Sequence, residues 1–96
     1  MPLKYDDPKT QLFDVPTPEG VVPCVVRIIE SSNIVWIGWP ERPTHTPLMF
    51  VEFKGGGRYV YLGVTRQRAT ACAYAESTGS YFAKKIKGKF ECIKLR

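Results

Sequence analysis

Two tyrosines and two basic side chains surround a run of three glycines near the middle of the chain, and their types suit the binding of a nucleotide. Tyr59 and Tyr61 are two residues apart, so on an extended strand they point to the same face and can stack on flat bases. Lys54 and Arg58 lie beside them and can contact phosphate. Paired aromatic residues on a strand are also typical of a core, so a packing role stays open.

A second group of candidate residues lies near the carboxyl end. If a helix begins near Ser80, its free backbone N–H groups and the hydroxyls of Ser77, Thr78 and Ser80 form a cradle for an anion. Helix capping explains the same hydroxyls without a ligand. The predicted ligand-binding residues are Lys54, Arg58, Tyr59, Tyr61, Ser77, Thr78, Ser80, Tyr81, Lys84 and Lys85.

Residues suited to catalysis or metal binding do not form a pattern. His45, the single histidine, lies in a proline-rich loop without a nucleophile motif, and the glycine run lacks the order of a phosphate-binding loop. Cys24, Cys72 and Cys92 are far apart, so neither a disulfide framework nor a zinc site is indicated, and we interpret them as reduced core thiols. We therefore expect no enzymatic activity, no cofactor and no metal.

The elements that position these residues are predicted to be a series of strands, then two helices and a last strand, which is typical of an α+β protein. Gly55, Gly56 and Gly57 allow a tight turn, which predicts an antiparallel hairpin of strands 48–53 and 58–63. Thr65 is the expected N-cap of a longer helix over 66–76, and Ser80 that of a short helix ending near 86. Strands are also expected over 21–29, 34–39 and 89–95. The prediction is an antiparallel meander packed by one longer and one short helix, with an extra C-terminal strand.

Two segments are expected to reach beyond the core. Both faces of strand 34–39 are apolar, so we expect at least one ring of Trp36 and Trp39 to meet a partner or a ligand. Residues 1–20 hold four prolines and predict an extended arm that wraps its own domain or reaches a neighbouring subunit, with Leu12, Phe13 and Val15 as its apolar contacts. Residues 21–96 then form a single domain.

The charge of the chain is unevenly distributed. Residues 1–48 carry four basic and six acidic side chains, whereas residues 49–96 carry ten basic and three acidic ones, so the net charge of +5 comes from the second half. A polyanion is the natural partner of such a surface. A chain of 96 residues buries a modest surface, which favours a homo-oligomer. No apolar run has the length of a membrane helix and no secretion signal is present, so we expect a cytoplasmic protein without membrane contact.

Residues 31–90 resemble the KTSC domain, which occurs at the carboxyl end of some lysyl-tRNA synthetases and alone in small bacterial and phage proteins. The resemblance covers nearly two thirds of the chain, and its centre is the Tyr-x-Tyr motif. It is carried by Ser31-Ser32-Asn33-Ile34, Ile37-Gly38, Phe53-Lys54-Gly55, Tyr59-Val60-Tyr61, Val64 and Ser77-Thr78-Gly79-Ser80-Tyr81-Phe82 before Ile86. The function of the family is poorly defined, so the resemblance narrows the fold more than the activity.

The residues and the resemblance together lead to one expectation and two alternatives. We expect a non-enzymatic binding protein for an anionic nucleotide, such as a sponge that sequesters a cyclic oligonucleotide immune signal in the host cytoplasm, because the family occurs in phage. The association with synthetases implies an RNA-binding module instead. The apolar strands and the aromatic arm fit a protein-interaction or structural subunit.

Overall fold

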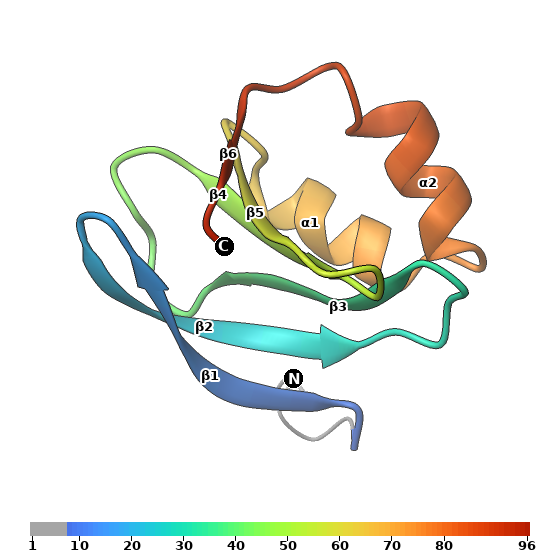
Figure 1. Ribbon diagram of the computed structural model, residues 1–96, viewed down its shortest axis with the longest axis horizontal. Coiled ribbons are helices and arrows are strands. Elements are labelled where there is room, and N and C mark those ends of the chain that lie inside the picture. The colour runs from blue at the N-terminus through green and yellow to red at the C-terminus, as the bar shows by residue number, and fades with distance from the viewer. Residues whose placement is uncertain (1–7) are drawn as a thin grey trace.

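Alternating apolar residues and short turns build a six-stranded sheet in the computed structural model, which describes residues 8–96 (Figure 1). Every strand pairs with the next one along the chain, and all pairs are antiparallel, which confirms the predicted meander and α+β class. The strands are β1 (Thr10–Thr17), β2 (Gly20–Ile28), β3 (Ile34–Pro40), β4 (Leu48–Phe53), β5 (Arg58–Leu62) and the extra C-terminal strand β6 (Cys92–Lys94).

The glycine run forms the β4–β5 hairpin as predicted. Gly56 and Gly57 have φ values of +96° and +100°, which residues other than glycine rarely adopt. The N–H of Phe53 donates to the carbonyl of Gly57 at 3.1 Å and closes the turn. The turn thereby sets the register that pairs Val51 with Tyr59.

Two helices, α1 (Arg66–Ala73) and α2 (Thr78–Lys85), cover one face of the sheet (Figure 1). Thr65 caps α1 as predicted, with its hydroxyl accepting from the N–H of Arg68 at 3.2 Å. Each helix has eight residues, so the expectation of one longer and one short helix was wrong. The α1 helix ends early because the buried hydroxyl of Thr78 donates to the carbonyl of Cys72 at 3.0 Å and holds the turn beneath its last residues.

The start of α2 also differs from the prediction. Ser77 is the N-cap, and its hydroxyl accepts from the N–H of Ser80 at 3.3 Å. Ser80 therefore lies in the first turn of the helix and does not cap it. Both serines have cap-forming side chains, and the anchoring of Thr78 under α1 selects the earlier one.

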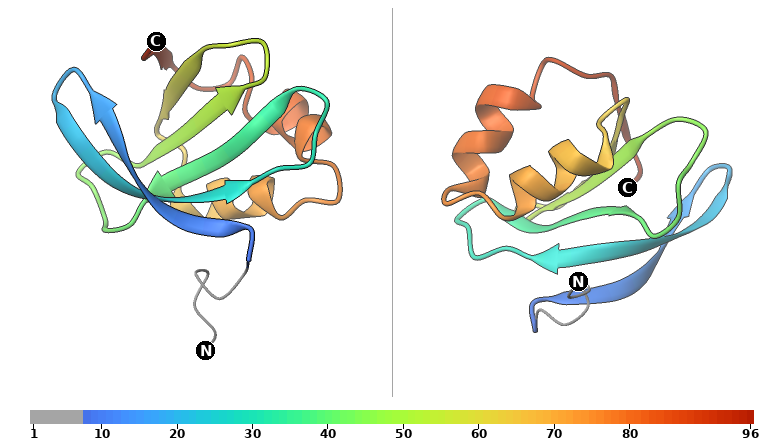
Figure 2. Two further views of the ribbon diagram at one scale, coloured as in Figure 1. Left: turned by 60° about the horizontal axis from the view of Figure 1, so that its bottom comes forward. Right: turned by 180° about the vertical axis from the view of Figure 1, so that it is seen from behind.

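Apolar side chains form a core on each side of the sheet. The sheet is curved and both helices lie on one side of it (Figure 2). The helix-side core joins the sheet to both helices, and the concave-face core lies on the other face. The sheet bends far enough for the tip of the β1–β2 hairpin and β6 to line a common groove of about 640 Å³. The concave-face core consists of Val15, Cys24, Val26, Trp36, Phe50 and Val60.

Part of the segment predicted as an arm over residues 1–20 enters this sheet. Residues 10–17 form β1, which pairs with β2 along its whole length. Val15 is buried and Phe13 meets the Trp36 ring at a centroid distance of 5.8 Å, whereas Leu12 is exposed. Residues 1–7 of the predicted arm lie outside the described residues. The apolar contacts of residues 10–17 are therefore made within the domain.

Both tryptophans are buried in the chain, so the expectation that one ring meets a partner or a ligand was wrong. Trp39 lies in the helix-side core and Trp36 in the concave-face core. A register irregularity between Ile34 and Trp36 places these two residues on opposite faces, although they are two positions apart. The curved sheet and the helices thus cover both apolar faces of β3, which leaves neither ring as a surface for another protein.

The three cysteines divide into two buried thiols and one exposed thiol. Burial raises the pKa of Cys24 and of Cys72 to about 12, which keeps both thiols protonated and agrees with the prediction of reduced core residues. Cys92 lies exposed on β6, so the prediction was wrong for that residue. The strand that carries Cys92 is an edge strand, and its outer side chains meet solvent.

Candidate functional site

Tyr59 and Tyr61 share a face of β5 as predicted, and that face is the one covered by α2. Tyr61 is 6% exposed and meets the ring of Phe82 edge-on at 5.5 Å, while the half-buried Tyr59 meets Phe53 at 5.7 Å. Burial, with a smaller contribution from Cys92, raises the pKa of Tyr61 to about 12. The two rings pack the helix layer on the sheet, which leaves Tyr61 no free face for a base.

Arg58 lies on the opposite face of β5, in the concave side of the sheet. Its Nε donates to Oε1 of Glu52 at 2.8 Å, and its guanidinium lies 5.2 Å from the Phe13 ring centroid and 5.4 Å from that of Trp36. The charge of Arg58 is therefore matched inside the chain. The structure does not bring Arg58 together with Tyr59 and Tyr61.

The other basic candidates lie on the outer surface. Lys54 is exposed at the β4–β5 turn, and Lys84 and Lys85 are exposed in the last turn of α2, where the helix dipole favours cations. Tyr81 is half-buried and packs against the helix-side core. Lys54 comes from the β4–β5 turn and the other three from α2, and none of the four lines the groove between the β1–β2 hairpin and β6.

Ser77, Thr78 and Ser80 line a polar hollow of about 520 Å³. It lies where the turn between α1 and α2 meets the turn between β2 and β3. Residues from four segments meet there: Lys9, Arg27, Ile29, Glu30, Ser31, Ser32, Ala75, Glu76, Ser77, Thr78, Gly79 and Ser80. The three hydroxyl residues predicted to form an anion cradle thus line one surface hollow, and sequence reasoning missed its other wall.

The hydroxyl groups that line the hollow have different structural roles. Thr78 is 7% exposed and donates to the end of α1, so its hydroxyl is structural. Ser77 and Ser31 accept backbone N–H groups, from Ser80 at 3.3 Å and from Asn33 at 3.1 Å. A hydroxyl that accepts in this way still has its own hydrogen to donate. Ser31 and Ser77 can therefore present donors to an anion while they hold their turns.

Two cations line the hollow, and each is held by the chain. Nη1 of Arg27 donates to the carbonyl of Ala73 at 3.1 Å, and the guanidinium lies 4.3 Å from the centroid of the Tyr74 ring. Nζ of Lys9 lies 3.3 Å from Oε1 of Glu30. With Glu76 also present, the lining contains two basic and two acidic side chains. Such a balance suits a ligand with few phosphates and several hydroxyl or amino groups better than a densely charged anion.

The structure shows neither a metal cluster nor a membrane helix among the residues it describes. No three His, Cys, Asp or Glu side chains of residues 8–96 lie close enough together to hold a metal ion. No helix within the same range is long and apolar enough to cross a membrane.

The central part of the chain is similar to a known protein family. A family model described as the KTSC domain matches residues 30–90. The matched range contains β3, β4, β5, both helices and most of the polar hollow, whereas Lys9, Arg27 and Ile29 precede it. No curated protein matches the chain significantly.

Proposed function

The chain belongs to the KTSC domain family, and from this premise we propose that it is a non-enzymatic binding protein whose polar hollow holds an anionic nucleotide. The observation that carries the proposal is the meeting of hydroxyls, two cations and the start of α2 around one hollow. The first backbone N–H groups of a helix have no partner within the helix and favour an anion. Ser31, Ser77 and Arg27 add donors from three other positions.

The biological role that we propose is sequestration. A cyclic oligonucleotide immune signal combines a small number of phosphates with ribose hydroxyls and amino groups, which agrees with the balanced charge of the hollow. A phage-type protein that binds this signal without hydrolysing it lowers the free concentration in the host cytoplasm. Because such a ligand carries repeated phosphates, a homo-oligomer with one hollow for each phosphate is the matching assembly.

A charge inserted into the hollow tests the proposal without harming the fold. Ser80→Glu completes a capping box with Ser77, so we expect an unchanged or slightly raised melting temperature. The new carboxylate faces the bound phosphate, so we expect the affinity for cyclic di- and trinucleotides to fall at least about tenfold, measured by isothermal titration calorimetry. Gln67→Glu is the matched control, because it adds the same charge to the first turn of α1 outside the hollow.

The outcomes separate the classes of function. Equal affinity in both variants, or no binding to any nucleotide of the panel, contradicts a nucleotide site in the hollow. Mass spectrometry of ligand released by heating gives the second test. Intact nucleotide supports sequestration, and a hydrolysed product shows that the protein is an enzyme.

RNA binding is the second candidate, and the charge of the helix layer favours it. From residue 63 to residue 89, the part of the chain that contains both helices, the only acidic residue in the sequence is Glu76, whereas six residues are basic: Arg66, Arg68, Lys84, Lys85, Lys87 and Lys89. An extended phosphate backbone suits this surface. The test is single-stranded RNA of increasing length. Affinity that rises with length, falls steeply with salt and is lost in Lys84→Glu and Lys87→Glu supports RNA over a compact nucleotide.

A further inference from the structure

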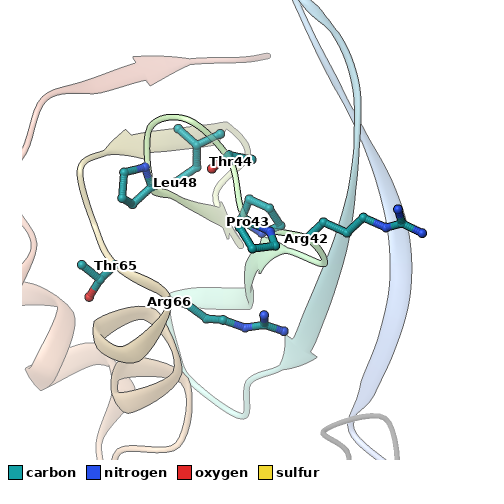
Figure 3. A pocket seen from close by; sticks show the side chains of 8 residues that line it. Arg42, Pro43, Thr44, Leu48, Thr65 and Arg66 are labelled. Atoms are coloured by element: carbon teal, nitrogen blue, oxygen red, sulfur yellow. The ribbon is translucent and has the colours of Figure 1, made fainter.

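A second pocket, of about 200 Å³, lies between the loop after β3 and the start of α1 (Figure 3). It shares no lining residue with the polar hollow. Its walls are three prolines and a leucine, and its polar residues are two threonines and two arginines. The complete lining is Pro40, Arg42, Pro43, Thr44, Pro47, Leu48, Thr65 and Arg66.

Hydrogen bonds fix the walls of this pocket at both ends of the loop. The N–H of Glu41 donates to the carbonyl of Pro23 at 2.9 Å, and the N–H of Gly63 donates to that of Pro47 at 2.7 Å. Between them, the hydroxyl of Thr44 donates to a carbonyl two residues further along. The proline rings also restrict the backbone. The pocket is therefore formed before a ligand arrives, which lowers the entropic cost of binding.

The two arginines at the rim have no counter-charge in the structure. Arg42 and Arg66 are exposed, and neither takes part in an ion pair, a hydrogen bond of its side chain or a ring contact within residues 8–96. None of the eight lining residues is acidic. In Figure 3 the side chain of Arg42 extends outward from the pocket, away from Pro43, whereas that of Arg66 runs from the start of α1 and ends below Pro43. The first turn of α1 contains no acidic side chain either, which leaves the positive potential of this region uncompensated.

We propose that this pocket binds a ligand that carries an anionic oxygen group, a carboxylate or a phosphate, on an apolar or ring-shaped body. The prolines and Leu48 offer the apolar wall for the body. Guanidinium groups match the planar oxygens of a carboxylate and those of a phosphate through paired hydrogen bonds. The proposal rests on residues that the nucleotide site does not use, so each can fail without the other.

Benzoate, phenyl phosphate and neutral phenol test the chemistry, because they share a ring and differ in the anionic group. Each is titrated into the ¹⁵N-labelled chain, and the amide resonances are followed by NMR. We expect benzoate or phenyl phosphate to shift the amides of Arg42, Thr44 and Arg66, and phenol to bind at least about tenfold more weakly. The anion that binds more tightly, benzoate or phenyl phosphate, identifies whether the pocket prefers a carboxylate or a phosphate.

Charge-removing variants complete the test. Arg42→Gln combined with Arg66→Gln should weaken the anion about tenfold or more, since hydrogen bonds to charged groups are the strong ones. Arg68→Gln is the matched control, because Arg68 lies in the same helical turn and does not line the pocket. Three results overturn the proposal: phenol bound as well as the anions, shifts confined to residues 77–80, or an equal loss of affinity in Arg68→Gln.

Discussion

Arg58 combines three roles in one side chain. Its guanidinium neutralises Glu52, covers the rings of Phe13 and Trp36, and lies on the concave face with only 11% of the side chain exposed. Arg96 also approaches Oε1 of Glu52, at 3.2 Å, but its side chain is 62% exposed. The two arginines share a carboxylate and differ in burial, which allows a direct comparison of their contributions.

We expect Arg58→Ala to lower the free energy of unfolding by about 2–3 kcal/mol, because Glu52 then keeps its burial and loses its main partner. Arg96→Ala should cost less than about 1 kcal/mol, as is usual for exposed ion pairs. Urea denaturation followed by circular dichroism measures both. Equal costs for the two variants would show that the burial of Arg58 contributes nothing to the pair.

At the scale of single residues, the sequence predicted which side chains share a face of a strand, but it did not predict which of these faces is buried. Strand alternation places Tyr59 and Tyr61 together, and the same rule places Arg58 on the other face. Which face the helices cover depends on how α2 packs on β5, and no local pattern contains this information. The rings of Tyr61 and Phe82 meet across a large separation in sequence, so the core role of the tyrosine is a tertiary property.

At the scale of elements, one hydroxyl joins the two helices. Thr78 lies in the first turn of α2 and donates to the last carbonyls of α1, at 3.0 Å to Cys72 and 3.4 Å to Ala73. Arg27 reaches the same end of α1 from β2, at 3.1 Å to the carbonyl of Ala73. The end of α1 is thus satisfied by side chains from a strand and from the next helix, which fixes the turn that lines the polar hollow.

Thr78→Val keeps the shape of the side chain and removes its donor. We expect it to lower the free energy of unfolding by about 1–3 kcal/mol, because buried carbonyls lose a partner. Hydrogen exchange of the turn over residues 74–77 should accelerate. Thr70→Val is the control, since its hydroxyl bond to Gln67 is exposed, and we expect a change within about 0.5 kcal/mol. A similar cost for both substitutions would contradict the role of Thr78 as a clamp.

The existence and order of the elements from β2 onward could be predicted from the sequence, whereas β1 and the ends of the elements could not. The glycine hairpin and the Thr65 cap follow from local rules and are confirmed. Ser77 and Ser80, three positions apart, both satisfied the rule for a cap, and the choice of Ser77 depends on a tertiary contact of Thr78. The irregularity between Ile34 and Trp36 likewise has no marker in the sequence, because Ile34, Val35, Trp36 and Ile37 are all apolar.

At the scale of the whole molecule, buried ionisable groups lie on both sides of the sheet. Cys24 belongs to the concave-face core, while Cys72 and Tyr61 belong to the helix-side core. Burial is the largest cause of each raised pKa, to about 12 in all three cases, with Asp14 adding to the effect on Cys24. Unfolding exposes these groups and returns them toward their ordinary values of 9.0 for the thiols and 10.0 for the phenol.

The free energy of unfolding should therefore decrease as the pH rises into the alkaline range. Well below pH 9 the thiols are protonated in both states and contribute nothing to the slope, whereas from near pH 9 up to about pH 12 the unfolded chain releases their protons and the folded chain retains them. We expect a loss of up to about 1.4 kcal/mol per pH unit for each thiol. Urea denaturation between pH 7 and 11 measures the slope. Cys24→Ala combined with Cys72→Ala should flatten it, and an unchanged slope would contradict the assignment.

The polar hollow is also a property of the whole molecule. Its two walls are the 29–32 turn and the 75–80 turn, which the packing of α1 on β3 brings together. The sequence indicated the second wall through its hydroxyls. Arg27 could have been suspected as the one charged residue in an apolar strand, but its closeness to Ser77 depends on the finished fold.

The consecutive pairing of the strands also sets the order of folding events. Strands β1 to β5 are joined by short turns, so each hairpin closes a small loop at a low entropic cost. Pairing of β5 with β6 must instead enclose residues 63–91, which include both helices. Until that step, β5 presents an unpaired edge rich in aromatic and branched residues. Delayed docking of β6 is therefore the stage at which nascent chains are most exposed to edge-to-edge aggregation.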